Sequence, residues 1–307
     1  MLQRGMANNS AAIARIGDID SQFSHVAIVA EGIDGRPVMV EALIEDGAVV
    51  TPLEKALAHG IGRAILFRHR DRALAREAAA LIRDHVLRTR ESPSQRVLYD
   101  FTMQPEGYGE LYCAKLVRLA YSMASTGEIR LPTYATLLDM RNRDFIERIG
   151  VSTIATFAPG DLELEPDFDV VAEWHDYRVT SELRLKDMIM TKLFEWMERH
   201  DYRFRPNLLI RLVACGGRLM AHLPDSLQEA LRDRIGKVPP NMGPRAIAAV
   251  AMLHKTAEVL YARLAELEGD MIRKAGRQLH PRQVLDELEL MRLELGRRIG
   301  YLIQRKA

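Results

Sequence analysis

The chain contains two cysteines, and the first of them lies where a thiol could act as a nucleophile. Cys113 follows the glycine-containing segment "TMQPEGYGELY" and enters an amphipathic stretch that predicts a helix beginning near Glu110. Unpaired N–H groups in the first turn of a helix favour negative charge, and the thiolate is the reactive form of cysteine. The alternative interpretation is a small buried side chain on the helix face shared with Val117 and Ala120.

A cysteine nucleophile needs a base, and His25 with Glu41 could supply one. The segment "SHVAIVAEGIDGRPVMVEAL" predicts a hairpin, because two β-branched runs flank a turn. If this hairpin folds about Ile33 and Asp34, His25 lies opposite a residue near Leu43, and Glu41 is its diagonal neighbour on the same face. A slip of one residue would put the two side chains on opposite faces. The alternative is a strand-end histidine and a solvent-facing glutamate.

Motifs for several other kinds of site are absent from the sequence. It contains no GxxxxGK[ST] for phosphate, no GxGxxG for dinucleotides, no HExxH and no GxSxG. The nine histidines are scattered and the two cysteines lie far apart, so the spacing of a zinc site is absent as well. The sequence therefore predicts neither a metal nor another cofactor, and it leaves the cysteine as the remaining catalytic candidate.

The region that must position these residues mixes short strands and helices, from about Ser24 to Tyr177. Residues 71–90 predict a helix that places apolar side chains on one face. Residues 151–176 read as two strands around a Pro-Gly-Asp turn near Pro159. The strand signal ends after Thr180, and the remaining sequence predicts helices only.

The last sixty or so residues carry a heptad pattern. Its apolar positions alternate in steps of four and three, and a second stripe follows the breaks at Gly276 and Pro281. Two long helices joined by a short loop are predicted. Their seam is interpreted as the internal core of a helical hairpin, and the alternative is a homo-oligomer formed through these C-terminal helices. The first stripe consists of Ala246, Val250, Leu253, Ala257, Leu260, Leu264, Leu267 and Met271.

Three further residues receive structural interpretations. Cys215, beside two glycines, is expected in close packing, and Trp174 and Trp196 are expected in the core or at a domain interface.

Composition limits the class of protein and its partners. The formal charge is +1, from 43 basic and 42 acidic residues, so no nucleic-acid partner is expected. The longest apolar run, "AIAAVAML", is too short for a membrane span, and the first residues lack the apolar centre of a secretory signal. Two cysteines make no disulfide framework and fit a reducing compartment. A cytoplasmic location is the expectation, with delivery by a route without a cleaved signal left open.

Four segments together resemble a known family. "SHVAIV", "MVEAL", "VVTPLEKAL" and "YDFTMQPEGYGELYCAKLV" are similar to the permuted NlpC-type, papain-like amidases and their YiiX-like branch. In that family a histidine strand comes first, an acidic or polar residue follows on the next strand, and the nucleophilic cysteine begins a later helix. The resemblance covers roughly residues 16–175.

The resemblance assigns roles to individual residues. It implies Cys113 as the nucleophile, His25 as the general base and acid, and Glu41 as the group that orients the imidazole. Tyr99, in the "YDF" run, and Tyr112, beside the cysteine, are expected to take part in substrate binding.

One departure from the family pattern concerns the N-terminal wall of the site. Relatives have a Pro-Gly-Asp strand well before the histidine, whereas here "IGDIDSQFSH" has isoleucine in place of the proline and leaves a short link to His25. The first strand and the loop that wall the substrate site are therefore expected to be shortened or supplied by other residues.

Together these patterns predict an α+β fold in two domains. Residues 1–178 are expected to form a permuted papain-like, NlpC-type catalytic domain, a small antiparallel sheet with packed helices. Residues 179–307 are expected to form an all-α helical domain that ends in the long hairpin.

The predicted activity is a cysteine-dependent amidase or peptidase-type hydrolysis through a thioester, on a small peptide or an N-acyl amino acid amide. Because permuted relatives similar to lecithin:retinol acyltransferase act on lipid esters, one alternative is a phospholipase-like esterase or acyltransferase acting on a lipid acyl substrate. Another is a catalytically idle scaffold that works through its helical domain.

Overall fold

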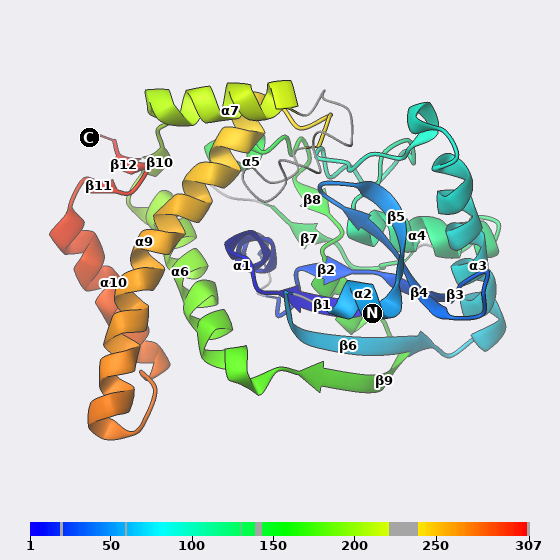
Figure 1. The fold of residues 1–307 in the computed structure, drawn as a ribbon, viewed down its shortest axis with the longest axis horizontal. Helices are drawn as coiled ribbons and strands as arrows, with labels where there is room; N and C mark the ends of the chain where they lie inside the picture. The colour runs from blue at the N-terminus through cyan, green and yellow to red at the C-terminus, as the bar shows by residue number, and fades with distance from the viewer. Residues whose placement is uncertain (19–20, 59, 130, 139–142, 221–238, 306–307) are drawn as a thin grey trace.

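The chain folds into a sheet-containing half and a helical half that lie side by side in Figure 1. The structure is a computed structural model that describes residues 1–18, 21–58, 60–129, 131–138, 143–220 and 239–305. Each half has its own cluster of buried apolar side chains. The N-terminal helix α1 (Asn8–Arg15) lies between the halves, and its Ala11 and Ala12 belong to the cluster of the helical half. The boundary at residue 178 stays a prediction.

The larger sheet has four antiparallel strands in the order β2-β1-β6-β9. These are β2 (His25–Val26), β1 (Leu2–Gly5), β6 (Ile61–His69) and β9 (Phe168–His175). The sequence did not predict β1, which nevertheless lies between β2 and β6. The chain begins inside the sheet that carries His25.

A second sheet holds the predicted hairpin. β3 (Ile28–Glu31), β4 (Pro37–Leu43) and β5 (Gly47–Pro52) pair antiparallel in this order, and the short helix α2 (Leu53–Leu57) follows. Ile28 pairs with Val40 and Ala30 with Val38, so the predicted register of the hairpin is confirmed for β3 and β4. The pairing ends at Ile28, and His25 lies opposite Gln3 in the other sheet, so the prediction that it lies opposite a residue near Leu43 is wrong.

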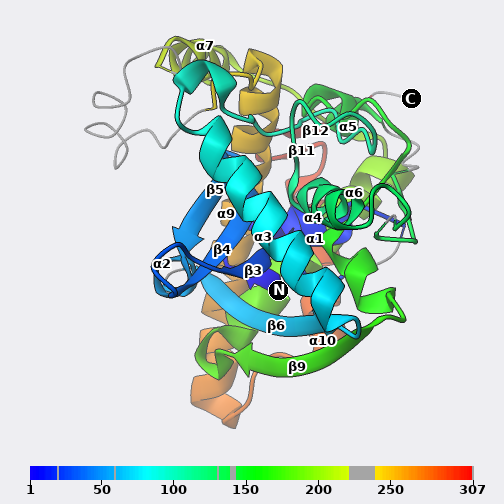
Figure 2. The same ribbon diagram turned by 90° about the vertical axis from the view of Figure 1, so that its right-hand side faces the viewer.

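Two helices, α3 and α4, pack against the three-stranded sheet. α3 (Arg72–Thr89) crosses β3, β4 and β5, as Figure 2 shows, and buries Ala78, Ile82 and Val86 as the helical pattern predicts. α4 (Cys113–Ala124) packs on α3, β2 and β4.

The helix α4 begins three residues later than predicted, so that Cys113 is its first residue. Smaller elements complete this half of the molecule: η1 (Pro93–Gln95), β7 (Thr136–Leu137), β8 (Ala155–Thr156) and η2 (Pro159–Leu164). The short helix α5 (Asp144–Arg148) packs on the helical half, and its Phe145 belongs to the buried cluster of that half. The two predicted strands around Pro159 are β8 and β9, with η2 between them.

The helical half contains the predicted hairpin together with a small sheet. Its helices are η3 (Tyr177–Val179), α6 (Thr180–Arg199), α7 (Leu208–Met220), α9 (Pro244–Ala275) and α10 (Pro281–Leu295). β10 (Tyr202–Phe204), β12 (Leu302–Gln304) and β11 (Arg298–Ile299) form an antiparallel sheet in this order. This half is thus mainly helical, as predicted, but it also contains three short strands that the prediction of an all-α domain did not include. These strands are too short to show a period of two, and β10 finds its partner only at the end of the chain.

The heptad seam of α9 is an internal core. Leu253, Ala257, Leu260 and Leu264 are buried and pack in one cluster with residues of α6 and α10, such as Leu193 and Leu288. These side chains are not available to a second copy of the chain. The interpretation as a hairpin core is confirmed for these positions, and the structure gives no support to an oligomer seam there.

Two predictions about single residues are wrong, and a third is confirmed. Cys215 is exposed, because α7 buries Ala214 and turns the next residue outward. Trp174 is 50% exposed, since β9 is an edge strand of its sheet. Trp196 is fully buried, and its indole N–H donates to Glu289 Oε2 at 3.1 Å.

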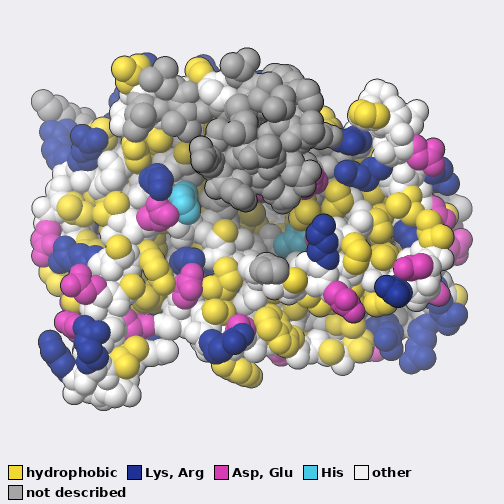
Figure 3. All heavy atoms as spheres, in the orientation of Figure 1, with side chains coloured by type: hydrophobic (Ala, Val, Ile, Leu, Met, Phe, Trp, Pro, Cys, Tyr) yellow, Lys and Arg dark blue, Asp and Glu magenta, His cyan; other side chains and the backbone are white. Residues whose placement is uncertain are grey.

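The surface carries charges of both signs. On the face shown in Figure 3, basic and acidic side chains are interspersed with apolar ones. Within the described ranges, none of the helices combines the length and the apolar character needed to cross a membrane.

The internal position of the seam leads to a test of stability. We expect Leu260→Ala to lower the free energy of unfolding by about 2–5 kcal/mol, because the lost methyl groups leave a cavity in the core. Leu293→Ala on α10, where the side chain is 62% exposed, should change it by less than about 0.5 kcal/mol. Urea denaturation followed by circular dichroism measures both. Equal stability of Leu260→Ala and wild type would contradict the internal core.

Candidate active site

A cleft of about 830 Å³ brings the three candidate catalytic residues together. His25, Glu41 and Cys113 all line it, and so does Tyr99. The cleft is bounded by β4 and β5 on one side and by β1 and α1 on another. Residues far apart in the sequence thus converge on one cavity.

Cys113 stands at the N-terminus of α4. Tyr112 precedes it in an extended conformation, and the first hydrogen bond of the helix joins Leu116 N–H to the carbonyl of Tyr112. The first N–H groups of a helix have no partner within it, so they favour negative charge and can donate to an anion. The Cys113 side chain is largely buried but reaches the cleft. This position suits a thiolate.

His25 and Glu41 form a hydrogen-bonded pair. The distance from His25 Nε2 to Glu41 Oε2 is 3.0 Å. Glu41 is buried, with 4% of its surface exposed, whereas 18% of the His25 side chain is exposed toward the cleft. A buried carboxylate requires a partner, and the imidazole supplies it. With Nε2 held by Glu41, Nδ1 is the ring nitrogen left for the thiol.

The pKa of His25 reflects both neighbours. Burial lowers this pKa, but hydrogen bonds to Cys113 and Glu41, and the negative charges of both, outweigh burial and raise the pKa of His25 to about 9. Because the ordinary value is 6.5, the imidazolium stabilises the folded state. That contribution is complete below pH 6.5 and is lost as the pH rises through about 9.

The two tyrosines predicted to bind substrate lie in different surroundings. Tyr99 lines the cleft, and burial, together with the nearby charge of Cys113, raises its pKa well above the usual range, so its hydroxyl stays neutral. Tyr112 does not line the cleft. Its hydroxyl lies 3.1 Å from Thr156 Oγ1, and burial raises the pKa of Tyr112 to about 12. Tyr112 therefore anchors the start of α4, and the expectation that it binds substrate is not supported.

A buried ion pair fixes the segment before Cys113. Lys115 Nζ lies 2.8 Å from Asp100 Oδ2, and both side chains are almost completely buried. The other oxygen of Asp100 accepts a hydrogen bond from the backbone N–H of Thr102 at 2.9 Å. The pair holds the "YDF" segment against the first turn of α4. In the sequence, the lysine two residues after the cysteine was the available sign of this pair.

A glycine brings the same segment close to β5. Gly47 has a φ of +67°, and a Cβ on it would collide with the carbonyl oxygen of Val97. Ala48 N–H donates to that oxygen at 2.9 Å. Because the backbones approach this closely, Tyr99 is set into the wall of the cleft.

The N-terminal wall is supplied by residues upstream of the predicted position. Gln3 of β1 pairs directly with His25 and lines the cleft, and Ser10 and Ile13 of α1 line it as well. Asp18, in the "IGD" segment, instead accepts a hydrogen bond from Leu137 N–H. The expectation of a wall built from other residues is confirmed.

Gln3 is a cleft residue that the sequence analysis missed. Its Nε2 lies 3.3 Å from the sulfur of Met39, and a thioether is a weak acceptor. The second partner of the same nitrogen is the sulfur of Met1, at 3.6 Å. The sequence did not indicate a strand here, because β1 has only four residues and no clear alternation of apolar and polar side chains.

Metal ligands are not gathered in this cleft. Among the residues that the structure describes, no three His, Cys, Asp or Glu side chains are grouped as potential metal ligands.

Comparison with known proteins gives one match. A family model described as "Permuted papain-like amidase enzyme, YaeF/YiiX, C92 family" matches residues 6–171, more than half of the chain. The matched range includes His25, Glu41 and Cys113. No curated protein and no solved structure matches the chain.

The hydrogen bond between His25 and Glu41 leads to a test by titration. We expect His25 to titrate near pH 9 in the wild type and nearer to 6.5 in Glu41→Gln, since the neutral amide removes one of the two charges that favour the imidazolium. Two-dimensional NMR of the imidazole protons measures both values. Glu54→Gln, at an exposed position of α2, serves as the matched control. An unchanged His25 titration in Glu41→Gln would contradict this account of the raised pKa.

Proposed function

The chain belongs to the family of permuted papain-like amidases of the YaeF/YiiX type, and from this premise we propose that Cys113, His25 and Glu41 hydrolyse an amide bond through a thioester. The observation that carries the proposal is the position of the His25 ring, which lies 3.0 Å from the buried carboxylate of Glu41 and lines the same cleft as Cys113. This arrangement supports the roles of Cys113 as nucleophile, His25 as base and Glu41 as orienting group.

The first half of the reaction forms the acyl-enzyme. His25 holds the proton of the Cys113 thiol, and the thiolate attacks the amide carbon to form a carbon–sulfur bond. The developing oxyanion is stabilised by N–H groups at the start of α4. The carbon–nitrogen bond then breaks as His25 returns the proton to the leaving amine, and the thioester remains.

The second half releases the acid. Water replaces the amine, His25 removes a proton from it, and the resulting hydroxide attacks the thioester carbon. The carbon–sulfur bond breaks and the thiolate is restored beside the imidazolium. Glu41 keeps the imidazole in the required orientation during both halves and stabilises its positive charge.

The lining of the cleft supports an amide substrate with polar groups. Charged side chains of both signs line it, next to apolar side chains of β4 and β5. A cleft with this lining suits a small peptide or an N-acyl amino acid better than a bare acyl chain, which would gain nothing from the charges. The charged residues are Glu45, Asp46, Lys55, Arg90 and Arg96.

The thiolate–imidazolium pair predicts an unusual reactivity of Cys113. We expect its alkylation by iodoacetamide to stay fast well below pH 8, where an ordinary thiol reacts slowly, and to become slower in His25→Ala. Cys215 is exposed and provides an internal reference in the same chain. Peptide mass spectrometry after quenching at several pH values gives both rates. Slow labelling that rises only near pH 8.5 and ignores His25 would favour an idle scaffold.

The assigned roles predict graded losses of activity. Cys113→Ala should lower amine release from a panel of dipeptide amides by more than about 10³-fold, because no other group can form the thioester. Glu41→Gln should leave partial activity, lowered by about 10–10³-fold, since orientation supplies only part of the rate.

The control and the alternative substrate complete this test. Cys215→Ala should retain wild-type activity. Full activity of Cys113→Ala would end the proposal. Fatty acid release from phospholipid micelles without amine release from the amides would replace it by the lipid esterase alternative.

A further inference from the structure

A second cavity lies away from the catalytic cleft. This groove, of about 640 Å³, is bordered by β3, β6, α3 and α4 and shares no lining residue with the cleft. His25 lines the cleft, whereas the next residue, Val26, lines the groove. The apolar side chains that line it include Val26, Ile28, Phe67, Val117, Tyr121, Leu162 and Phe168.

The charged side chains of the groove are predominantly basic. Four arginines line it, Arg68 from β6 and Arg72, Arg76 and Arg83 from α3, against the single carboxylate of Glu31. Arg83 forms an ion pair with Asp84. The groove therefore holds an excess of positive charge beside an apolar floor.

Three of these arginines have no partner among the described residues. The side chains of Arg68, Arg72 and Arg76 are exposed and form no ion pair or hydrogen bond with any of them. Two nearby arginines differ, because Arg63 of β6 pairs with Glu173 and Arg70, which follows β6, pairs with Asp169. Glu173 and Asp169 of β9 thus form ion pairs with arginines that do not line the groove.

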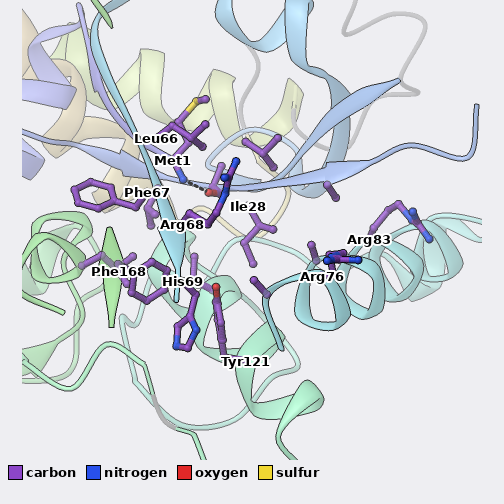
Figure 4. Close-up of a pocket in the computed structure, with 18 of the residues that line it drawn as sticks. Met1, Ile28, Leu66, Phe67, Arg68, His69, Arg76, Arg83, Tyr121 and Phe168 are labelled. Carbon is purple, nitrogen blue, oxygen red and sulfur yellow. Dashed lines mark hydrogen bonds between the residues drawn. The ribbon is translucent and has the colours of Figure 1, made fainter. Parts of the chain in front are cut away.

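The arrangement of the side chains gives the groove two different ends. In Figure 4, Phe67, Phe168 and Tyr121 gather at one end, Arg76 and Arg83 lie toward the other, and Arg68 lies between them. At the aromatic end His69 contacts the rings of Tyr121 and Phe168, with centroid distances of 5.4 and 5.1 Å. One end suits an apolar chain and the other suits an anion.

We propose that this groove binds a single-chain anionic amphiphile, a long-chain fatty acid. The acyl chain lies along the apolar floor toward Phe67 and Phe168, and the carboxylate is held by Arg68 and Arg76. Guanidinium groups bind carboxylates through charge-assisted hydrogen bonds. The cavity is within the size range of small-molecule sites. The proposal does not depend on the catalytic role of Cys113.

The groove and the cleft are joined by shared elements. Val117 and Tyr121 follow Cys113 by about one and two turns of α4, and Val26 directly follows His25. A bound fatty acid would therefore contact the helix and the strand that position the catalytic candidates. The test must consequently separate binding in the groove from binding in the cleft.

Calorimetric titration of the full chain with decanoate, below its micellar concentration, tests this binding. We expect decanoate to bind at least tenfold more tightly than 1-decanol, which has the same chain and no charge, and decyltrimethylammonium to bind more weakly still. Acetate, which has the charge but no chain, should give no measurable binding. Acetate binding as tight as that of decanoate would indicate a simple anion site and would overturn the proposal. So would 1-decanol binding as tight as that of decanoate.

Variants locate the site. The double variant Arg68→Gln and Arg76→Gln should weaken decanoate binding about tenfold or more and leave 1-decanol unaffected. Arg88→Gln lies on the same helix, is exposed and is outside the groove, so it should bind decanoate as the wild type does. Ala79→Trp should weaken both decanoate and 1-decanol, because the indole fills the floor. Thermal unfolding confirms that each variant is folded.

Alkylation of Cys113 separates the two cavities. Protein labelled with iodoacetamide has a blocked cleft and should bind decanoate with unchanged affinity. Loss of binding on labelling would assign the fatty acid to the cleft and overturn the proposal. Unchanged decanoate binding in the double glutamine variant, or none in the wild type, would overturn it too.

Discussion

The hydrogen bond between His25 and Glu41 is the interaction on which the rest of the catalytic arrangement depends. The two residues belong to different sheets, since His25 is on β2 and Glu41 is on β4. The chain passes from one sheet to the other at Ala27, whose N–H donates to the carbonyl of Met1. A buried carboxylate without its partner would be strongly destabilising, so the pair holds the two sheets in one relative position. The imidazole of His25 is thereby held in one orientation in the cleft that Cys113 also lines.

Cys113 is positioned by contacts that come from several directions. The buried Lys115–Asp100 pair holds α4 to the segment before it, and the hydroxyl of Tyr112 reaches Thr156. Asn241, from the segment before α9, donates to the carbonyl of Tyr99 at 2.7 Å and to Glu110. The helical half therefore takes part in placing the cleft, although it lies outside the range of the family match. A buried ion pair adds little net stability. The Lys115–Asp100 pair instead fixes the position of α4 relative to the segment before it.

Local patterns predicted the elements whose contacts are close in sequence. The register of β3 and β4, the buried face of α3 and the seam of α9 each follow from a period of two or of 3.6 within one segment. The family resemblance supplied the pairing of His25 with Cys113, which no spacing could give. The strands that the sequence did not predict pair with segments far away in the chain. β1 is a strand because β2 and β6 flank it, and β10 is a strand because β12 returns to it from the end of the chain.

The same reasoning explains the missed groove. Each of its residues has a local explanation, since Val117 and Tyr121 belong to the apolar face of α4 and Arg72 and Arg76 belong to the polar face of α3. Only the packing of α3 beside β3 and β6 brings an apolar floor and unpaired arginines together. Acidic residues of β9 neutralise Arg63 and Arg70 but not Arg68. Charge left without a partner next to apolar surface is a property of the tertiary structure, and it distinguishes a binding groove from a gap between elements.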